Sequence, residues 1–71
     1  MKYLVIIEKA EHNFAAYVPD LPGCVSTGET VEETLTNIQE AIEGHLAVMR
    51  EYGDPIPEPT TVAAEIEIKV A

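Results

Sequence analysis

Residues 30–53 constrain the fold most, because their apolar side chains recur with the period of an α-helix. At about 100° per residue, one narrow stripe contains Val31, Leu35, Ile38, Ile42, Leu46 and Met49. One shoulder of this stripe carries Thr34, Ala41, Val48 and Tyr52, and His45 lies between the stripe and the shoulder. The apolar arc is about 160° wide, which is more than a helix needs to cover one face of a sheet. The sequence therefore predicts a long amphipathic helix that packs on a sheet and keeps apolar surface to spare.

Capping residues mark both ends of this helix. Thr30 and Glu33 form a T-x-x-E capping box, in which the Thr30 hydroxyl accepts from the Glu33 N–H and the Glu33 side chain reaches back. At the other end Gly53 can take the left-handed C-cap conformation, and Pro55 cannot continue the helix. These signals predict helix ends close to residues 30 and 53.

Three short strand patterns precede the helix. Residues 2–8 are apolar on both faces, which suits a central strand covered on both sides or central in an oligomer. Residues 14–18 alternate and follow a short polar turn, so the first two strands are expected to form a hairpin. Residues 24–27 supply a short third strand.

Prolines and glycines separate the third strand from its neighbours. The run from Pro19 to Gly23 breaks the ladder, and Pro22-Gly23 fits the centre of a type II turn with a positive φ at Gly23. Gly28 then lets the chain leave the sheet for the helix. This turn is predicted to depend on the conformational freedom of Gly23.

The helix is followed by a proline-rich arm and a last strand pattern. Residues 54–61 carry prolines at alternate positions, which is typical of a semi-rigid, extended arm. Residues 62–70 alternate apolar with charged side chains, as a strand with one buried face does. The expected order is β-β-β-α-β, and the crossover through the helix should be right-handed. We therefore predict a single two-layer α+β domain over residues 1–71 with mixed sheet order 3-2-1-4, or with the last strand on a neighbouring subunit.

Composition limits the classes of function. A chain of 71 residues is marginal alone unless it oligomerises. The net charge of −9 argues against direct binding to nucleic acid and suits simple solubility or a basic partner. The lone Cys24 is interpreted as a packing residue in a reducing, cytoplasmic setting. No stretch suits a signal peptide or a membrane span.

Catalytic chemistry finds little support in the residues. The carboxylates considered for a metal-dependent nuclease site are Glu8, Glu40, Glu43, Glu65 and Glu67. Glu40 and Glu43 point away from the apolar stripe, and hence away from the sheet. His12 is most simply solvated, whereas His45 fits the core edge or a subunit contact, and neither has a partner at catalytic or metal-ligand spacing. We expect no enzyme activity, metal or cofactor.

Four motifs along the chain form a recognisable set. They are Pro-Asp-Leu-Pro-Gly-Cys at residues 19–24, Gly-Glu-Thr at 28–30, Glu-Ala-Ile at 40–42 and Gly-Asp-Pro-Ile-Pro at 53–57. Together they resemble the HicB-like family, the antitoxins of bacterial and archaeal toxin–antitoxin pairs. The resemblance covers nearly the whole chain, with Thr34 standing where alanine is common, and it implies a reduced ribonuclease H-like sheet.

The resemblance also implies a function. It predicts a protein-binding module that neutralises a small basic HicA-type toxin, an RNA-cleaving protein, by masking its RNA-binding surface. Asp20, Glu40 and Glu43 are the candidate contacts. Longer family members often add a DNA-binding segment, which is not expected here because the sequence stops at Ala71. The alternatives are a stand-alone oligomeric ligand-binding or regulatory domain without a toxin and, third, a ribonuclease H-like nuclease.

The spare apolar surface predicts self-association. A helix of about 22 residues is about 33 Å long, whereas a strand of seven residues spans roughly 23 Å. The overhanging helix end, the proline arm and the open sheet edge need cover. We therefore expect a homodimer or a dimer of dimers, with Val48, Tyr52 and Ile56 among the contacts.

Overall fold

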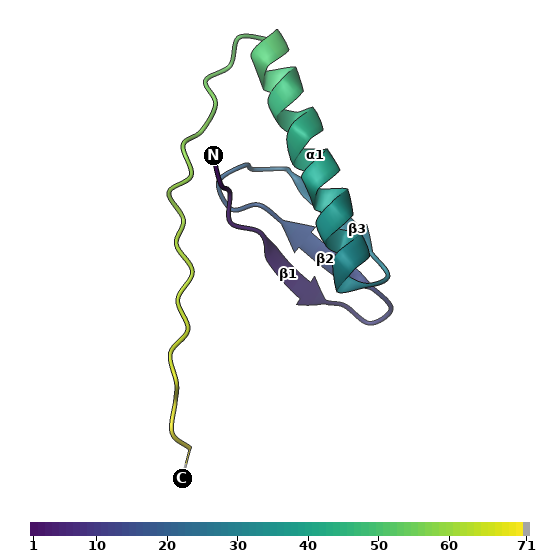
Figure 1. Cartoon of the computed structure of the whole chain (residues 1–71), viewed down its shortest axis with the longest axis vertical. Coiled ribbons are helices and arrows are strands. Elements are labelled where there is room, and N and C mark those ends of the chain that lie inside the picture. Colours follow the sequence, from purple (N-terminus) through teal and green to yellow (C-terminus); the bar gives the residue numbers. More distant parts are fainter. Residues whose placement is uncertain (71) are drawn as a thin grey trace.

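The computed structural model describes residues 1–70, which form three strands and one helix in two layers (Figure 1). The elements are β1 (Ile6–Lys9), β2 (Phe14–Tyr17), β3 (Val25–Gly28) and α1 (Val31–Glu51). The strands form an antiparallel sheet in the order β1-β2-β3, and α1 packs on one face, mainly over β3 and β2. The expected α+β class is confirmed: a three-stranded meander is followed by one long helix. No helix in the described part of the chain is long and apolar enough to cross a membrane.

The predicted capping box begins α1. Thr30 has an extended backbone, and its hydroxyl accepts a hydrogen bond from the N–H of Glu33 at 3.0 Å. The Glu33 carboxylate accepts from the N–H of Glu29 at 3.3 Å, one residue before the position that the simplest capping box uses. The N-terminal boundary read from the sequence is therefore confirmed.

A glycine C-cap ends α1. Gly53 has a φ of 70° and its N–H donates to the carbonyl of Arg50, while the N–H of Asp54 donates to the carbonyl of Met49 at 2.8 Å. These two bonds form a Schellman motif, which satisfies carbonyls that the last helical turn leaves without partners. The predicted role of Gly53 is confirmed.

The turn between β2 and β3 is closed by backbone hydrogen bonds. The N–H of Cys24 donates to the carbonyl of Leu21 at 3.0 Å, and Gly23 has a φ of 84°, as predicted. Because a Cβ on Gly23 would meet no atom within 4 Å outside the adjoining residues, the backbone conformation rather than crowding is what favours glycine here. The turn buries Leu21 completely and so contributes to the core as well as to the connection.

The side of α1 that faces the sheet differs from the apolar stripe predicted from the sequence. The buried helix residues are Thr34 and Ile38, whereas Val31 and Leu35 are exposed, so α1 is rotated toward the shoulder of the apolar arc. The rotation brings Thr34 against the end of β3, where a Cβ on Gly28 would lie 2.5 Å from its hydroxyl oxygen. The Thr34 hydroxyl donates to the carbonyl of Thr30 at 2.7 Å, and this hydrogen bond offsets the free-energy cost of burying the hydroxyl completely.

The prediction of a fourth strand within the sheet is wrong. Among residues 1–70 the sheet contains β1, β2 and β3 alone, so the order 3-2-1-4 is not formed within one chain. Residues 54–70 instead form an extended arm that returns past the start of β1 and continues beyond the body (Figure 1). The radius of gyration is 14.4 Å, against about 11 Å for a compact chain of this length. Alternation alone cannot supply the hydrogen-bonding partner that a strand requires.

Candidate interaction surfaces

The arm is attached to the body at Asp20. Its carboxylate accepts four hydrogen bonds: from the N–H groups of Thr60 and Thr61, both at 3.0 Å, and from their hydroxyls at 3.2 and 2.8 Å. A second attachment is the Tyr3 hydroxyl, which donates to the carbonyl of Pro57 at 2.5 Å. We call these contacts the arm clamp. It joins residues about 40 and 54 positions apart, which no local pattern in the sequence revealed.

The clamp lowers the pKa of Asp20 below its ordinary value. The largest cause is the hydrogen bond from the Thr61 N–H, followed by the Thr61 hydroxyl; desolvation opposes them, and the two Thr60 bonds add to the lowering. All of these donors stabilise the ionised carboxylate. Asp20 therefore stays charged, with its oxygens occupied by the arm.

Acidification should release the arm. The pKa of Asp20 is lowered from 3.8 in the folded chain. The ionised carboxylate therefore stabilises the clamped arm at pH values above the pKa of the unfolded chain, and this stabilisation is lost as the pH falls through the pKa of the folded chain. NMR shifts of the Thr60 and Thr61 amides should therefore titrate with a midpoint below 3.8. In Asp20→Asn these amides should show no such step. A midpoint at or above the ordinary value would contradict the clamp.

Glu40 and Glu43, the other two candidate contacts, lie exposed on α1. The Glu43 carboxylate accepts a hydrogen bond from the Gln39 side chain at 3.2 Å, one helical turn away. No hydrogen bond or ion pair among the described residues links either glutamate to Asp20. The structure thus separates the three candidate contacts: two exposed glutamates lie on α1, and the Asp20 carboxylate is bound to the arm.

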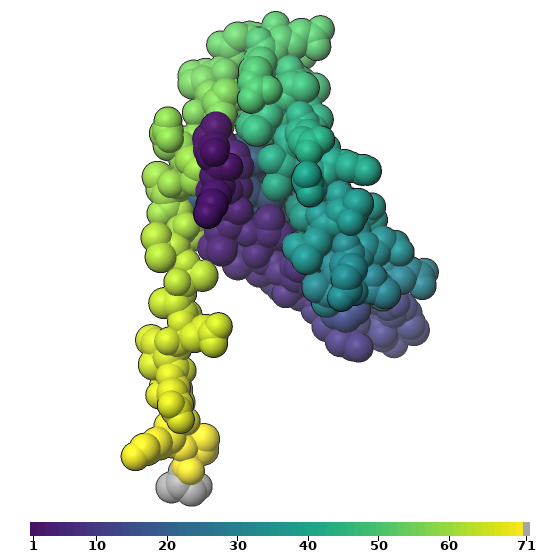
Figure 2. All heavy atoms as spheres, in the orientation of Figure 1, coloured from purple at the N-terminus to yellow at the C-terminus, as the bar shows by residue number. Residues whose placement is uncertain are grey.

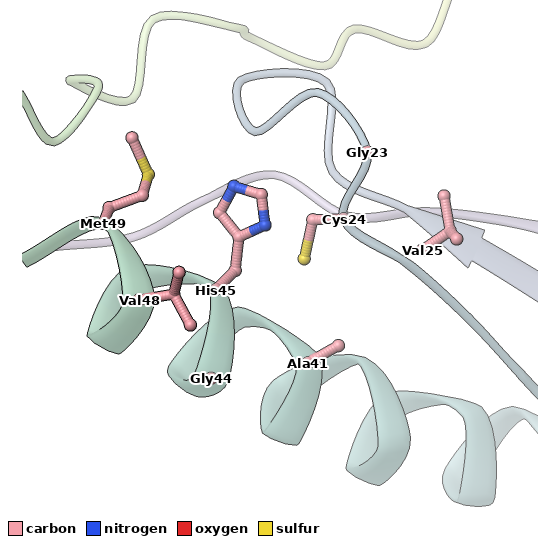
Figure 3. A pocket seen from close by; sticks show the side chains of 8 residues that line it. All are labelled: Gly23, Cys24, Val25, Ala41, Gly44, His45, Val48 and Met49. Atoms are coloured by element: carbon pink, nitrogen blue, oxygen red, sulfur yellow. The ribbon is translucent and has the colours of Figure 1, made fainter. Parts of the chain in front are cut away.

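A shallow, mostly apolar pocket lies between the turn and α1 (Figure 3). Its volume is about 350 Å³, and its lining includes Cys24, Ala41, His45 and Val48. Burial raises the pKa of the Cys24 thiol, so the thiol is protonated and inert as a nucleophile. Cys24 belongs to the buried core, in agreement with its prediction as a packing residue. Within residues 1–70 no group of three His, Cys, Asp or Glu side chains could hold a metal ion.

The three candidates for self-association lie near the C-terminal end of α1 and on the arm. Val48 is half-exposed and lines the pocket, and Tyr52 is largely exposed at the C-cap. Ile56 is partly buried in the arm. Two of the three are therefore open to a partner.

The sheet face opposite α1 adds an apolar row that the sequence did not single out as a site. Cross-strand partners point to the same face of a sheet, and Ile6 pairs with Tyr17, which pairs with Val25. Ala16, the neighbour of Tyr17, is buried under α1, so this row faces the other way. Tyr17 and Val25 are exposed there. The signal for this face was the apolar character of both sides of the first two strand patterns.

Comparison with known proteins identifies the family. Residues 3–69 match the sequence profile of a family described as the HicB-like antitoxin of bacterial toxin–antitoxin systems. The chain belongs to the HicB-like antitoxin family. This assignment confirms the resemblance carried by the four sequence motifs.

Relatives of this HicB-like chain occur in a phage and in an archaeon. The chain is 37% identical over 62 residues to a 14.9 kDa protein from the rep–hol intergenic region of Haemophilus phage HP1, covering 87% of this chain. It spans about half, 47%, of that relative's length. It is 43% identical over 58 residues to a UPF0150 protein of Thermoplasma acidophilum, covering 80% of this chain and 84% of the relative.

A solved structure shares the HicB-like fold. The chain superimposes on a chain of a HicA3 and HicB3 toxin–antitoxin complex with a TM-score of 0.72 and 32% sequence identity. The match covers 84% of this chain and 70% of the other. The arrangement of one helix on a meander is therefore shared with a chain from a toxin–antitoxin assembly.

Proposed function

We propose that this HicB-like chain neutralises a small, basic, RNA-cleaving toxin of the HicA type by occupying the surface that the RNA backbone needs. The observation that supports this most directly is the likeness to a chain of the HicA3 and HicB3 complex. The family membership agrees with it. Neutralisation in this proposal is steric and electrostatic and requires no chemical step.

The charge of the chain suits such a partner. A protein that holds RNA must present basic side chains to phosphates, and this chain carries a net charge of −9. Complementary charge accelerates encounter and disfavours wrong partners. The association should therefore weaken as added salt screens the exposed charges.

The two glutamates on α1 are better placed to contact a partner than Asp20 is. Glu40 and Glu43 are exposed and one helical turn apart, so both can meet basic side chains of one partner surface. Asp20 already accepts four hydrogen bonds, which matches the acceptor capacity of a carboxylate. In this proposal Glu40 and Glu43 contact the toxin, and Asp20 contacts it after the arm is released.

Charge reversal on the helix tests these contacts. The chain is co-expressed with the basic product of the adjacent reading frame, and the dissociation constant of the purified pair is measured at several salt concentrations. Glu40→Lys/Glu43→Lys should raise it by about tenfold or more, because attractive pairs become repulsive.

The matched control changes the net charge equally at another place. Glu8→Lys/Glu11→Lys alters exposed residues at the end of β1 and in the following turn, so it should reduce steering without removing the contact. Equal effects of the two double variants on the dissociation constant would rule out a local contact at Glu40 and Glu43. Failure of the two proteins to co-purify at low salt, or RNA cleavage unaffected by excess chain, would rule out the antitoxin function.

The second candidate function is a stand-alone oligomeric ligand-binding or regulatory domain. The pocket beside α1 favours it, since 350 Å³ lies at the lower end of the sizes that ligand sites usually have. In either function we propose that the chain self-associates, because Val48 and Tyr52 expose apolar surface. A ligand that shifts the NMR signals of His45 and Val48 in a chain without a toxin partner would support this candidate.

A further inference from the structure

The end of the arm has the pattern of a strand but no cover. Four of its apolar side chains, Val62, Ile66, Ile68 and Val70, are 72–91% exposed. Figure 2 shows this segment standing clear of the body of the molecule. Apolar residues at alternate positions would share one face of a strand. The segment therefore has an apolar strand face that nothing in the described chain covers.

The sheet has a matching open edge. β1 is hydrogen-bonded to β2 on one side, and along its other side no strand pairs with it within residues 1–70. The helix packs mainly over β3 and β2, so it leaves the β1 side of the sheet less covered. Tyr3, Val5 and Ile7 on this side are only partly buried against the core. An unpaired edge of this kind is a template for an added strand.

The arm clamp directs the segment away from its own edge. Tyr3 and Asp20 hold Pro57 and Thr60–Thr61 at the end of the sheet where β1 begins. Prolines at positions 55, 57 and 59 keep the preceding stretch extended and semi-rigid. Beyond the clamp the chain runs past β1 and leaves the body (Figure 1).

We propose that residues 62–70 pair with the β1 edge of a second copy of this chain, whose own arm pairs with the first. Each copy has one unpaired strand pattern and an unpaired β1 edge within residues 1–70, so a single two-fold exchange pairs both segments and gives a closed dimer. The alternating glutamates Glu65 and Glu67 then face water while the isoleucines beside them are buried.

The size of the exchange suits a stable dimer. Specific interfaces engage roughly 20–30 residues on each side. Each copy would bring the nine positions 62–70 and the eight positions 2–9, with the clamp residues beside them. Two copies of charge −9 repel each other, so this apolar exchange should tighten as salt is added. The inference concerns the chain alone and does not depend on a toxin partner.

The test measures mass and amide protection on the full chain without any partner. Sedimentation equilibrium should give a two-chain mass for the wild type. Amide hydrogen exchange of residues 62–70 should be slowed only at concentrations where the dimer forms. Ile66→Ser/Ile68→Ser should raise the dimer dissociation constant by about 100-fold or more, because four buried isoleucines are lost per dimer.

The control alters the opposite face of the same segment. Glu65→Ser/Glu67→Ser should keep or tighten the dimer, since it removes negative charge and no buried side chain. Both double variants should keep the helical circular dichroism of the wild type, because the changed residues do not contact the core within one chain.

Three outcomes would overturn the exchange. They are a one-chain mass at high micromolar concentration, protection of the arm in a monomer, and a dimer that Ile66→Ser/Ile68→Ser leaves intact. The second result would mean pairing within the chain, and the third a dimer formed through another surface. None of them bears on toxin binding, which the co-purification experiment measures separately.

Discussion

Replacing Leu21 by alanine should lower the free energy of unfolding by about 2–5 kcal/mol, the usual cost of removing a fully buried leucine side chain. Leu21 is 0% exposed although it lies in a turn, and it packs with Val18, Cys24 and Ile38. A chain of this length has roughly 4–11 kcal/mol of stability in total. The variant should therefore melt far below the wild type or fail to fold.

The same substitution at Leu35 is the matched control. Sequence periodicity placed Leu35 in the apolar stripe, but the side chain is 46% exposed. Leu35→Ala should therefore cost about 1 kcal/mol or less, because a half-exposed side chain loses little burial. Urea unfolding of both variants at one fixed chain concentration separates the effects, since self-association makes stability depend on concentration. Equal losses would contradict the orientation of α1.

Gly28→Ala should destabilise the domain by about 1–3 kcal/mol through overpacking. A Cβ at position 28 would lie 2.5–2.9 Å from the Thr34 hydroxyl, N and Cα atoms. Two of these three atoms belong to the backbone of α1, so the strain cannot be relieved by turning a side chain. The helix would have to move away from the end of β3, and the melting temperature should fall with it.

Gly44→Ala makes the same chemical change in the middle of α1. Outside the adjoining residues and the backbone of α1, no atom lies within 4 Å of a Cβ at position 44, so the helix should gain about 0.5–1 kcal/mol from the better helix former. Opposite signs for the two glycine variants in thermal melts would establish the close contact of Gly28 with Thr34. A neutral or stabilising Gly28→Ala would refute that contact.

The features that the sequence predicted correctly, the helix ends and the turn at Gly23, depend on interactions between residues close together in the chain. The capping residues Thr30 and Gly53 set the helix ends, because each acts on backbone groups of the adjoining turn. Gly23 took its positive φ because the turn demands it locally. The turn and helix-start motifs likewise predicted the family, which the match over residues 3–69 confirms.

Contacts between distant residues explain what the sequence did not predict. Alternation at residues 62–70 specifies a strand face but not the edge it pairs with, and within residues 1–70 the β1 edge stays open. The helical period leaves the rotation of α1 undetermined within its wide apolar arc.

The sequence by itself determined the helix, its caps, the turn at Gly23 and the acidic HicB-like character of the chain. Tertiary structure alone decided that Thr34 faces Gly28 and that Asp20 holds the arm 40 residues away. The reason is that capping and turn preferences act between near neighbours, whereas close packing and long-range hydrogen bonds depend on which surfaces meet once the chain has folded.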